Sequence, residues 1–574
     1  MKKIFEVDGP KRAVRKCLIR EDIMLEGFVP YPEEFIKRYR QKGLWMDKTI
    51  GEELDSAVAK YGDRIALARN GQYATYRELG ERATRLALHF IEKGLRPYDR
   101  MIFQLPNEME FAYCFYAAVK IGVIPIMSLP AHRDAEISFF AQFTKARAHA
   151  MPSRFKDFSH QAMSREIQKN APALELQFVS GEPVEDGFIS ITALLNDKIE
   201  ERVPVELLNQ YRPDPLEPAL FQLSGGTTGV PKIIPRTHND YSLNFKVVAD
   251  ICGVTEASAT GIAIPVNHNF ALSCPGLLGT LYKGAKVVLI PSPKTETVLE
   301  AVQKERVTIM PTPPALLIRW MEFPELGNYD LSSLKYVIAG GARLNAEVAK
   351  KIKPMLGCDY FQNLGMAEGM GFWSRIGDPE ELLLNSQGAP MFDDDEVRVV
   401  DENEKDVPYG ESGELLVRGP ITIRGYYNSP EYNRKAFTTD GFYRTGDVVR
   451  MYKGRYLSVE GRIKDTINRG AEKISAEEVE NHILAYAKVE NCAFVAMPDR
   501  ILGEKGCAFV MTKGNQTLTL DELNRFLREE RHISTFKLPE RLELVSEFPF
   551  TNVGKIDKKE LRRVIKEKLE QEGT

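Results

Sequence analysis

The chain has 574 residues, of which 43% are hydrophobic and 28% are charged, and its formal net charge is −4. A single hydrophobic core rarely extends beyond about 250–300 residues, so several compact units are expected. The small negative charge lacks the basic excess that is typical of nucleic-acid-binding proteins, and we expect no nucleic-acid partner.

The seven cysteines are scattered along the chain and form no Cys-x-x-Cys pair. Their odd number and their spacing predict reduced thiols in a cytoplasmic protein, without a zinc site or a disulfide framework. No hydrophobic signal-peptide region follows the basic start of the chain. The most apolar segment, residues 111–129, contains Lys120, Gly122 and Pro125. It predicts a buried helix followed by a strand, and we expect no membrane span.

The first elements predict parallel sheets covered by helices. Residues 1–24 form an N-terminal extension in which we find no chemistry. Thr75 and Glu78 have the spacing of a capping box before an apolar helical pattern. Two apolar runs, residues 101–105 and 123–127, then flank a helical segment. This strand, helix, strand order is typical of α/β folds.

A glycine-rich loop, SGGTTGVPK, runs from Ser224 to Lys232 between apolar runs at residues 219–223 and 233–234. This pattern predicts a strand, a loop and a second strand. Glycines let the backbone approach a ligand closely, while hydroxyl groups and a lysine add donors and charge, as in a phosphate cradle. It is not a Walker A loop, because Pro231 precedes the lysine and β-branched residues follow it. The alternative is a solvated hairpin turn.

Further apolar runs continue the α/β pattern at residues 261–266, 287–290, 308–310 and 336–339. In open α/β sheets, ligands bind at the carboxyl ends of the strands. The loops expected there contain residues 224–232, 268–274 and 340–342.

The pattern changes after Glu396. Short alternating strands at residues 397–400, 413–417 and 456–460 predict a small antiparallel unit. A polar stretch at residues 461–465 follows, and then a compact α+β unit of roughly a hundred residues. We therefore expect an extension at 1–24, a large domain at 25–463 with two α/β subdomains and a small β subdomain, and a small α+β domain at 464–574.

Five motifs in this order resemble those of the ANL superfamily of adenylate-forming enzymes, which includes acyl-CoA synthetases, nonribosomal peptide adenylation domains and luciferases. They are SGGTTGVPK (Ser224 to Lys232), GMAEG (Gly365 to Gly369), YRTGD (Tyr443 to Asp447), GRIKD (Gly461 to Asp465) and TNVGK (Thr551 to Lys555).

Within that superfamily the chain is most similar to stand-alone aryl-acid AMP ligases of siderophore biosynthesis, which activate 2,3-dihydroxybenzoate or salicylate. This similarity extends from about Leu25 to the end of the chain. The stretches that carry it are IPRTHNDY (Ile234 to Tyr241), NHNFALSCPG (Asn267 to Gly276), NLGMAEG, RGPITIRGYY (Arg418 to Tyr427) and DTINRGAEKISAEEVENH (Asp465 to His482).

The resemblance implies two half-reactions. In the first, an aryl carboxylate attacks the α-phosphorus of ATP and expels pyrophosphate, with Glu368 binding Mg²⁺. Lys555 would reach in from the small domain, and His238 would complete the catalytic set. In the second, the small and mobile domain rotates about Lys464, and residues 469–473 line a tunnel for a thiol. That thiol belongs to the phosphopantetheine of an aryl carrier protein, or to CoA.

The resemblance also implies the residues that bind the nucleotide. Asp447 would accept hydrogen bonds from the ribose hydroxyls, and Arg462 would help to place the ribose and phosphates. The full implied ATP-binding set is Ser224, Gly225, Gly226, Thr227, Thr228, Gly229, Lys232, Gly341, Gly365, Met366, Asp447 and Arg462.

Substrate choice depends mainly on Asn269. Amino-acid-activating relatives place an aspartate there to pair with the α-ammonium, whereas an asparagine suits an ortho-hydroxyl beside the carboxylate. Cys274 is a weaker hydrogen-bond partner than a serine would be, which favours salicylate. The implied acid-binding residues are His268, Asn269, Phe270, Cys274, Gly340 and Gly371.

Residues 370–373 depart from the family pattern. Gly371 and Phe372 replace a branched aliphatic residue and an asparagine. We expect Gly371 to open space beside the ring and Phe372 to refill part of it, so that a substituted or bicyclic 2-hydroxyaryl acid becomes possible. Ala471 replaces a glycine of the usual GGE, which is a milder departure.

Simpler interpretations exist for each residue type. Lys555 could be a solvated charge, Glu368 a helix N-terminal carboxylate and Asp447 a turn cap. His268 could be a core histidine and His238 a surface one. Asn269 could merely turn the chain after a strand, and Cys274 could be a small buried hydrophobe.

Overall fold

The structure is a computed structural model of the chain, and it describes most of the sequence. The described residues are 24–224, 232–344, 346–462, 465–469, 472–499, 502–531, 533, 535–551 and 555–572. The predicted ATP-binding residues Gly225, Gly226, Thr227, Thr228 and Gly229, the predicted hinge Lys464 and the departure at Ala471 lie outside them.

The first sheet has seven strands in the order β11-β10-β4-β3-β5-β8-β9. Its strand pairs are parallel except β10 with β11. The strands are β3 (Arg100–Phe103), β4 (Ile124–Met127), β5 (Ala148–Pro152), β8 (Leu176–Ser180), β9 (Ile189–Ser190), β10 (Pro218–Leu223) and β11 (Ile233–Thr237). The helices along this part of the chain are α3 (Tyr76–Glu92), α4 (Met109–Lys120), α5 (Asp134–Phe143), α6 (His160–Asn170) and α7 (Ile191–Asn196).

The second sheet has nine strands in the order β18-β17-β16-β15-β14-β12-β13-β1-β2. Its interior pairs are parallel, and antiparallel strands close both edges. The strands are β1 (Ile65–Arg69), β2 (Gln72–Thr75), β12 (Ala259–Ile262), β13 (Lys286–Leu289), β14 (Ile309–Thr312), β15 (Tyr336–Ala339), β16 (Asp359–Gly365), β17 (Gly371–Trp373) and β18 (Ala389–Pro390).

The helices that accompany the second sheet are α2 (Ile50–Tyr61), α8 (His238–Ile251), α9 (Asn269–Ser273), α10 (Gly276–Tyr282), α11 (Thr295–Glu305), α12 (Pro314–Met321), α13 (Ala346–Leu356) and α14 (Glu380–Asn385). One apolar core joins the two sheets, because α2, α3, α4 and α10 pack between them. It contains Leu67 and Val287 of the second sheet together with Met101 and Phe103 of the first. The two α/β subdomains therefore share one apolar core.

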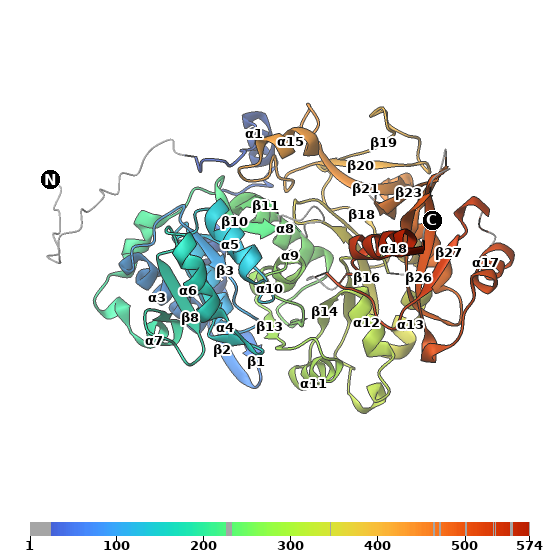
Figure 1. Ribbon diagram of the computed structural model, residues 1–574. Coiled ribbons are helices and arrows are strands. Elements are labelled where there is room, and N and C mark those ends of the chain that lie inside the picture. Colours follow the sequence, from blue (N-terminus) through green and yellow to red (C-terminus); the bar gives the residue numbers. More distant parts are fainter. Residues whose placement is uncertain are drawn as a thin grey trace.

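The third sheet is a four-stranded antiparallel unit in the order β19-β20-β21-β22. Its strands are β19 (Glu396–Val400), β20 (Ser412–Arg418), β21 (Tyr443–Met451) and β22 (Leu457–Arg462), and α1 (Glu33–Gln41) and α15 (Pro430–Ala436) lie near it (Figure 1). It is the small antiparallel unit that the sequence predicts.

The C-terminal unit follows β22. A five-stranded sheet, β24-β23-β26-β25 with β27 beside β26, has apolar clusters on both faces. Its strands are β23 (Thr466–Arg469), β24 (Glu472–Ser475), β25 (Val489–Asp499), β26 (Gly503–Thr512) and β27 (Arg541–Leu544), and its helices are α16 (Ala476–Leu484), α17 (Leu520–Glu529) and α18 (Lys558–Glu572). In Figure 1 this unit, in orange and red, lies beside the four-stranded sheet. The predicted α/β fold with a small α+β C-terminal domain is confirmed.

Short elements complete the chain. They are β6 (Arg154–Phe155), β7 (Phe158–Ser159), and the 3₁₀ turns η1 (Ile199–Glu201), η2 (Val205–Tyr211), η3 (Leu326–Asn328), η4 (Lys453–Arg455), η6 (Lys513–Asn515) and η7 (Thr535–Lys537).

Local predictions from the sequence also hold. Thr75 and Glu78 form the expected capping box at the start of α3. The six cysteines in the described residues are free and buried. Within the described ranges, none of the helices combines the length and apolar character that a membrane crossing requires.

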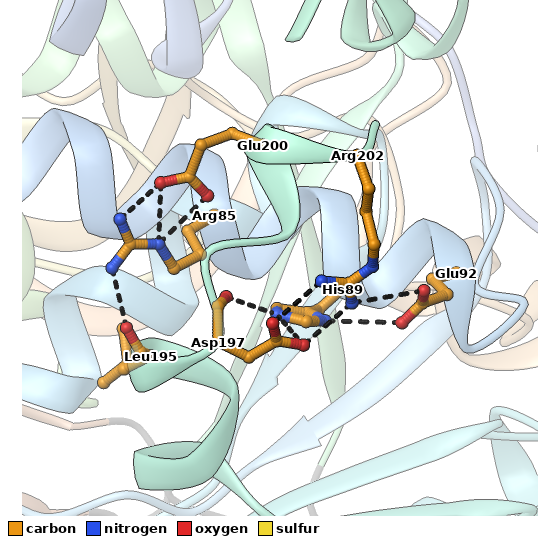
Figure 2. A network of polar contacts seen from close by, with 7 residues as sticks. All are labelled: Arg85, His89, Glu92, Leu195, Asp197, Glu200 and Arg202. Carbon is orange, nitrogen blue, oxygen red and sulfur yellow. Dashed lines mark hydrogen bonds and ion pairs between the residues drawn. The ribbon is translucent and has the colours of Figure 1, made fainter. Parts of the chain in front are cut away.

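A polar network fastens α3 to the segment that contains α7 and η1 (Figure 2). Arg85 on α3 donates to both carboxylate oxygens of Glu200 and to the Leu195 carbonyl at 2.7 Å. One turn later, His89 Nε2 lies 3.0 Å from the Asp197 carbonyl oxygen, and Arg202 pairs with the Asp197 carboxylate at 2.8 Å. These contacts hold the segment that contains α7 and η1 against α3 in the first subdomain.

Candidate active site

The glycine-rich loop starts and ends on two paired strands. β10 and β11 are antiparallel, with Leu223 opposite Ile233, which confirms the two predicted strands, while residues 225–231 lie outside the described residues. The Ser224 amide donates to the Lys232 carbonyl at 3.0 Å, and the Lys232 amide donates to Ser224 Oγ at 2.9 Å. These two hydrogen bonds fix the points at which the loop leaves and re-enters the sheet.

Lys232 and Glu368 both contact one buried tyrosine. The Lys232 ammonium lies 5.8 Å from the ring centre of Tyr426 and 4.1 Å from that of Tyr432. The Tyr426 hydroxyl donates to Glu368 Oε1 at 2.7 Å and lies 2.9 Å from the Tyr443 hydroxyl. Burial raises the pKa of Tyr426, so its hydroxyl stays protonated and able to donate. The structure thus brings the predicted phosphate-binding lysine close to the predicted metal ligand.

Asp447 and Arg462 face each other on neighbouring strands. They are partners in the β21–β22 register, and Arg462 Nε lies 2.7 Å from Asp447 Oδ1. Asp447 is only 3% exposed. Burial lowers the pKa of Arg462, but Asp447, Glu368 and further acidic neighbours together raise it above its ordinary value. This ion pair fixes the position of the Asp447 carboxylate, whose oxygens are hydrogen-bond acceptors.

Lys555 brings the C-terminal unit to this pair. Its amide donates to Thr551 Oγ1 at 3.2 Å in the segment before α18. Desolvation lowers the pKa of Lys555 and the Arg462 guanidinium lowers it further, while Asp447 and Glu477 act in the opposite direction. The lysine therefore lies within electrostatic range of both predicted ribose-binding residues.

His268 lies within range of the same lysine. It precedes α9, and its Nδ1 accepts a hydrogen bond from the Phe270 amide at 3.2 Å. Burial, helped by the charge of Lys555, lowers the pKa of His268 to about 4. Its imidazole is consequently neutral near pH 7.

Asn269 is held by its oxygen. The Tyr241 hydroxyl donates to Asn269 Oδ1 at 2.9 Å, and Ser273 Oγ donates to the Asn269 carbonyl at 3.0 Å. Within the described part of the chain, Nδ2 has no hydrogen-bond partner. Asn269 therefore offers two N–H donors to a ligand.

Phe270, Cys274 and Gly340 meet beside Asn269. A Cβ on Gly340 would lie 2.8 Å from the Phe270 ring, so only glycine fits there. Cys274 packs in the same apolar cluster as Phe270 and Trp373. Burial raises the pKa of the Cys274 thiol to about 11, so it is uncharged. We call Asn269, Phe270, Cys274, Gly340 and Gly371 the acid site.

Three predicted nucleotide-binding residues lie near the acid site along the same sheet. Gly341 follows β15 with a positive φ of 83°. Gly365 ends β16 and pairs with Gly371 on β17. Met366 follows Gly365 and packs partly buried against the core of the four-stranded sheet. These residues line the junction between the second and third sheets.

The expectations for Gly371 and Phe372 are corrected. A Cβ on Gly371 would lie 2.9 Å from Trp373 Nε1 and 3.4 Å from the Met391 thioether, so the glycine admits the indole edge where a side chain would otherwise lie. Phe372 packs with Ile234 and Met370 in the opposite cluster. The physical reason is the two-residue period of a strand, which places residues 371 and 373 on one face and 372 on the other.

His238 starts α8 and is fully buried, in contrast to the alternative of a surface histidine. Its Nδ1 accepts a hydrogen bond from the Ile50 amide at 3.2 Å, and burial lowers its pKa to about 3. The charged groups that act on it are Glu52 and Arg212. The contacts of His238 join α8 to α2, and its catalytic role stays a prediction.

Sequence reasoning missed several residues that support the site. Arg236 is buried, pairs with Asp240 at 2.7 Å and donates to the Ala367 carbonyl at 2.9 Å. It therefore links β11 to the GMAEG segment. Tyr241 and Tyr426 hold Asn269 and Glu368. The only signal for Arg236 and Tyr241 was their place within the IPRTHNDY stretch.

The sequence model of the AMP-binding enzyme family matches residues 54–427, and that of the AMP-binding enzyme C-terminal domain matches residues 478–555. The 2,3-dihydroxybenzoate-AMP ligase of Bacillus subtilis is 44% identical over 95% of this chain and 99% of the relative. A salicylyl-CoA synthase / salicylate adenylyltransferase from a Streptomyces species is 43% identical over the same shares, 95% and 99%.

A solved structure agrees with these matches. The apo structure of Mycobacterium smegmatis MbtA is 39% identical, with a TM-score of 0.72, and the match covers 94% of this chain and 98% of that one. The motifs, the arrangement of Asp447, Arg462 and Lys555, and these relatives agree over nearly the whole chain. The protein therefore belongs to the family of AMP-binding enzymes.

Proposed function

We propose that the protein uses ATP to convert a 2-hydroxyaryl carboxylic acid, of the salicylate or 2,3-dihydroxybenzoate type, to its acyl-adenylate with release of pyrophosphate. It then transfers the aryl group to the phosphopantetheine thiol of an aryl carrier protein. One observation carries this proposal: Lys555 of the C-terminal unit lies within electrostatic range of Asp447, Arg462 and His268.

Adenylation joins two anions, so it depends on positioning and charge neutralisation. In our proposal Lys555 stabilises the charge that the carboxylate and the α-phosphate share in the transition state. Desolvation and the neighbouring Arg462 guanidinium both lower its pKa. Asp447 holds the ribose hydroxyls, and Arg462 orients that carboxylate.

The residues fit one Mg²⁺ ion shared with ATP. In the described ranges no three potential ligands among His, Cys, Asp and Glu lie close enough to form a complete cage. Glu368 supplies one carboxylate, fixed through Oε1 by Tyr426. Mg²⁺ is commonly bound by one or two carboxylates together with phosphate oxygens and water. When bound, the ion would neutralise phosphate charge, and Lys232 and the Ser224–Lys232 loop would hold the outer phosphates.

The acid would bind with its ortho-hydroxyl against Asn269. The Tyr241 hydroxyl fixes Asn269 Oδ1, so the Nδ2 donors face the ligand. His268 is neutral near pH 7 and adds no positive charge to the carboxylate side. Cys274 offers little to a 3-hydroxyl, which favours salicylate over 2,3-dihydroxybenzoate.

For the second half-reaction we propose that the C-terminal unit rotates about Lys464 and presents residues 469–473 to the incoming thiol. The alternative acceptor is CoA, and the Streptomyces relative is named for both a CoA synthase and an adenylyltransferase activity. Two acceptors would thus compete for one adenylate.

The test is ATP–pyrophosphate exchange with a panel of aryl acids, followed by transfer to a holo carrier protein or to CoA. We expect exchange with salicylate or 2,3-dihydroxybenzoate, and faster loading of the carrier protein. Background exchange with every 2-hydroxyaryl acid would refute the proposal. Rapid CoA ester formation with the carrier protein ignored would favour the alternative.

A further inference from the structure

Two polar side chains form a pair on the sheet face beside the acid site. Asn363 on β16 and Trp373 on β17 are directly opposite in the antiparallel register, and Gly365 and Gly371 are the pair two residues further along. Opposite residues point to the same face of a sheet, and so do residues two apart. The Asn363 carboxamide and the Trp373 indole therefore share a face with two glycines.

Each polar group lies over one of these glycines. Trp373 Nε1 is 2.9 Å from the position that a Cβ on Gly371 would take, and Asn363 Nδ2 is 3.1 Å from that position on Gly365. Any larger side chain at either position would displace the polar group. The two glycines thus leave room for an indole donor and a carboxamide at positions that a Cβ would otherwise occupy.

Both groups face the acid site. Trp373 packs in the cluster that contains Phe270 and Cys274. Asn363 Oδ1 lies in the space that a Cβ on Gly340 would need, and the edge of the Phe270 ring borders the same space. The pair therefore extends the acid site along β16 and β17.

Neither side chain is satisfied by the protein. Asn363 is 5% exposed and Trp373 is 2% exposed. Asn363 Oδ1 is buried without a partner. No hydrogen bond joins the Asn363 amide nitrogen or Trp373 Nε1 to another described residue. Polar groups left unpaired in the interior destabilise a protein, and they are commonly paired by a ligand or water.

We propose that Asn363 and Trp373 form a hydrogen-bonding subsite for an oxygen substituent on the aryl ring, in addition to the ortho-hydroxyl at Asn269. A ring hydroxyl would accept from the indole N–H and donate to Asn363 Oδ1. This inference rests on the proposed function. It names the substrate as a 2-hydroxyaryl acid with a further ring oxygen, so that plain salicylate fills only part of the site.

The test compares matched acids in ATP–pyrophosphate exchange by the wild-type enzyme. Hydroxy- and methyl-substituted salicylates are paired at each ring position, because the two groups have similar size and differ in hydrogen bonding. We expect the hydroxyl member to have a kcat/KM about tenfold or more above its methyl partner at one position. A preference for methyl, or none, at every position would overturn the inference.

Two variants test whether Trp373 and Asn363 cause the preference for the hydroxyl-substituted acid. Trp373→Phe removes the donor and Asn363→Leu removes the carboxamide, and each should reduce the hydroxyl-to-methyl ratio about tenfold. The ratio is read within each variant, so a general loss of activity cancels. Trp320→Phe is the matched control, since Trp320 is equally buried, has an unpartnered indole N–H among the described residues and lies in a separate core. Its ratio should equal that of the wild type.

The outcomes separate this inference from the proposed function. If neither salicylate nor any substituted acid supports exchange, the proposed function fails and this inference with it. If salicylate supports exchange but the ratio is unchanged in both variants, only this inference fails. A higher KM for ATP in Asn363→Leu with an unchanged acid ratio would assign the carboxamide to the nucleotide and also overturn it.

Discussion

Asn269 decides the charge of the acid site. Its oxygen is fixed by Tyr241, so the variant Asn269→Asp would keep that contact and replace two N–H donors by an ionised oxygen. A carboxylate beside the substrate carboxylate is unfavourable, since like charges repel in a poorly solvated site.

We predict that Asn269→Asp lowers kcat/KM for salicylate in pyrophosphate exchange by about a hundredfold, equivalent to roughly 2.7 kcal/mol. Asn328→Asp is the control, because Asn328 is exposed on η3. An unchanged kcat/KM in Asn269→Asp would show that the acid binds elsewhere.

In our proposal, Lys555 stabilises the transition state of the first half-reaction. Lys555→Ala should lower exchange by at least about a hundredfold, since it removes the positive charge near Arg462 and Asp447. Thiol transfer from a preformed aryl-adenylate should change far less, because the lysine acts before that step. Lys566→Ala, on the exposed face of α18, should behave as the wild type. Normal exchange in Lys555→Ala would contradict this role.

At the residue scale, the motifs identified residues of the site, but they did not show toward which face of the sheet each side chain points. Asn269, Cys274 and Gly340 were predicted together, and the structure brings them together. The expectation for Phe372 was wrong because the start of β17 set which residues face inward. Trp373 was missed for the same reason, since a three-residue strand has no readable alternation.

At the element scale, the polar network of Figure 2 anchors the segment that contains α7 and η1 to helix α3. Arg85 on α3 holds both Glu200 and the Leu195 carbonyl, and its side chain is mostly buried. Partly buried bidentate pairs contribute more than exposed ion pairs, whose median is about 0–1 kcal/mol.

We predict that Arg85→Ala lowers the free energy of unfolding of the large domain by about 1–3 kcal/mol in urea denaturation. Arg165→Ala removes an exposed pair with Glu185 and should change it by less than about 0.5 kcal/mol. Equal effects of the two substitutions would refute a structural role for the network.

Elements with a clear apolar pattern were predicted from the sequence with close bounds. The predicted run 336–339 coincides with β15, and the run 287–290 matches β13 to within one residue at each end. β21 was not predicted, because its sequence YRTGDVVRM carries Thr445, Gly446 and Asp447 in place of alternating apolar residues. These motif residues therefore interrupt the apolar alternation from which β21 could have been predicted.

At the scale of the whole molecule, buried ionisable groups set how stability depends on pH. Asp395, between β18 and β19, is 2% exposed, and its Oδ2 accepts from the Phe392 amide at 3.1 Å. Burial raises the pKa of Asp395 to about 7. Since this pKa lies above the ordinary value, the native protein keeps a proton that the unfolded chain loses between about pH 4 and pH 7. The stabilising contribution of Asp395 is therefore full below about pH 4 and is lost as the pH rises to 7.

Asp395→Asn cannot ionise and retains an oxygen for the Phe392 amide. We predict that its free energy of unfolding relative to the wild type increases between pH 4 and pH 7, by about 2–4 kcal/mol in total. Denaturant unfolding at several pH values measures this difference. Asp63→Asn, at an exposed site, should show no such trend. A constant difference between Asp395→Asn and the wild type would contradict the buried, protonated carboxyl.

The division into a large α/β domain and a small C-terminal unit was predictable, because the polar stretch at residues 461–465 separates the antiparallel unit from the α+β unit that follows. The meeting of Lys555 with Asp447 and Arg462 was implied only by resemblance, since no local pattern reports the contact of segments about a hundred residues apart. That meeting is the feature on which the account depends.

The most direct test of the central claim is ATP–pyrophosphate exchange by the wild-type enzyme with 2-hydroxyaryl acids, benzoate and the proteinogenic amino acids. We predict exchange that depends on a 2-hydroxyaryl acid, is weaker by at least about tenfold with benzoate and is at background with amino acids. Exchange driven by an amino acid, or by benzoate as well as by salicylate, would contradict it.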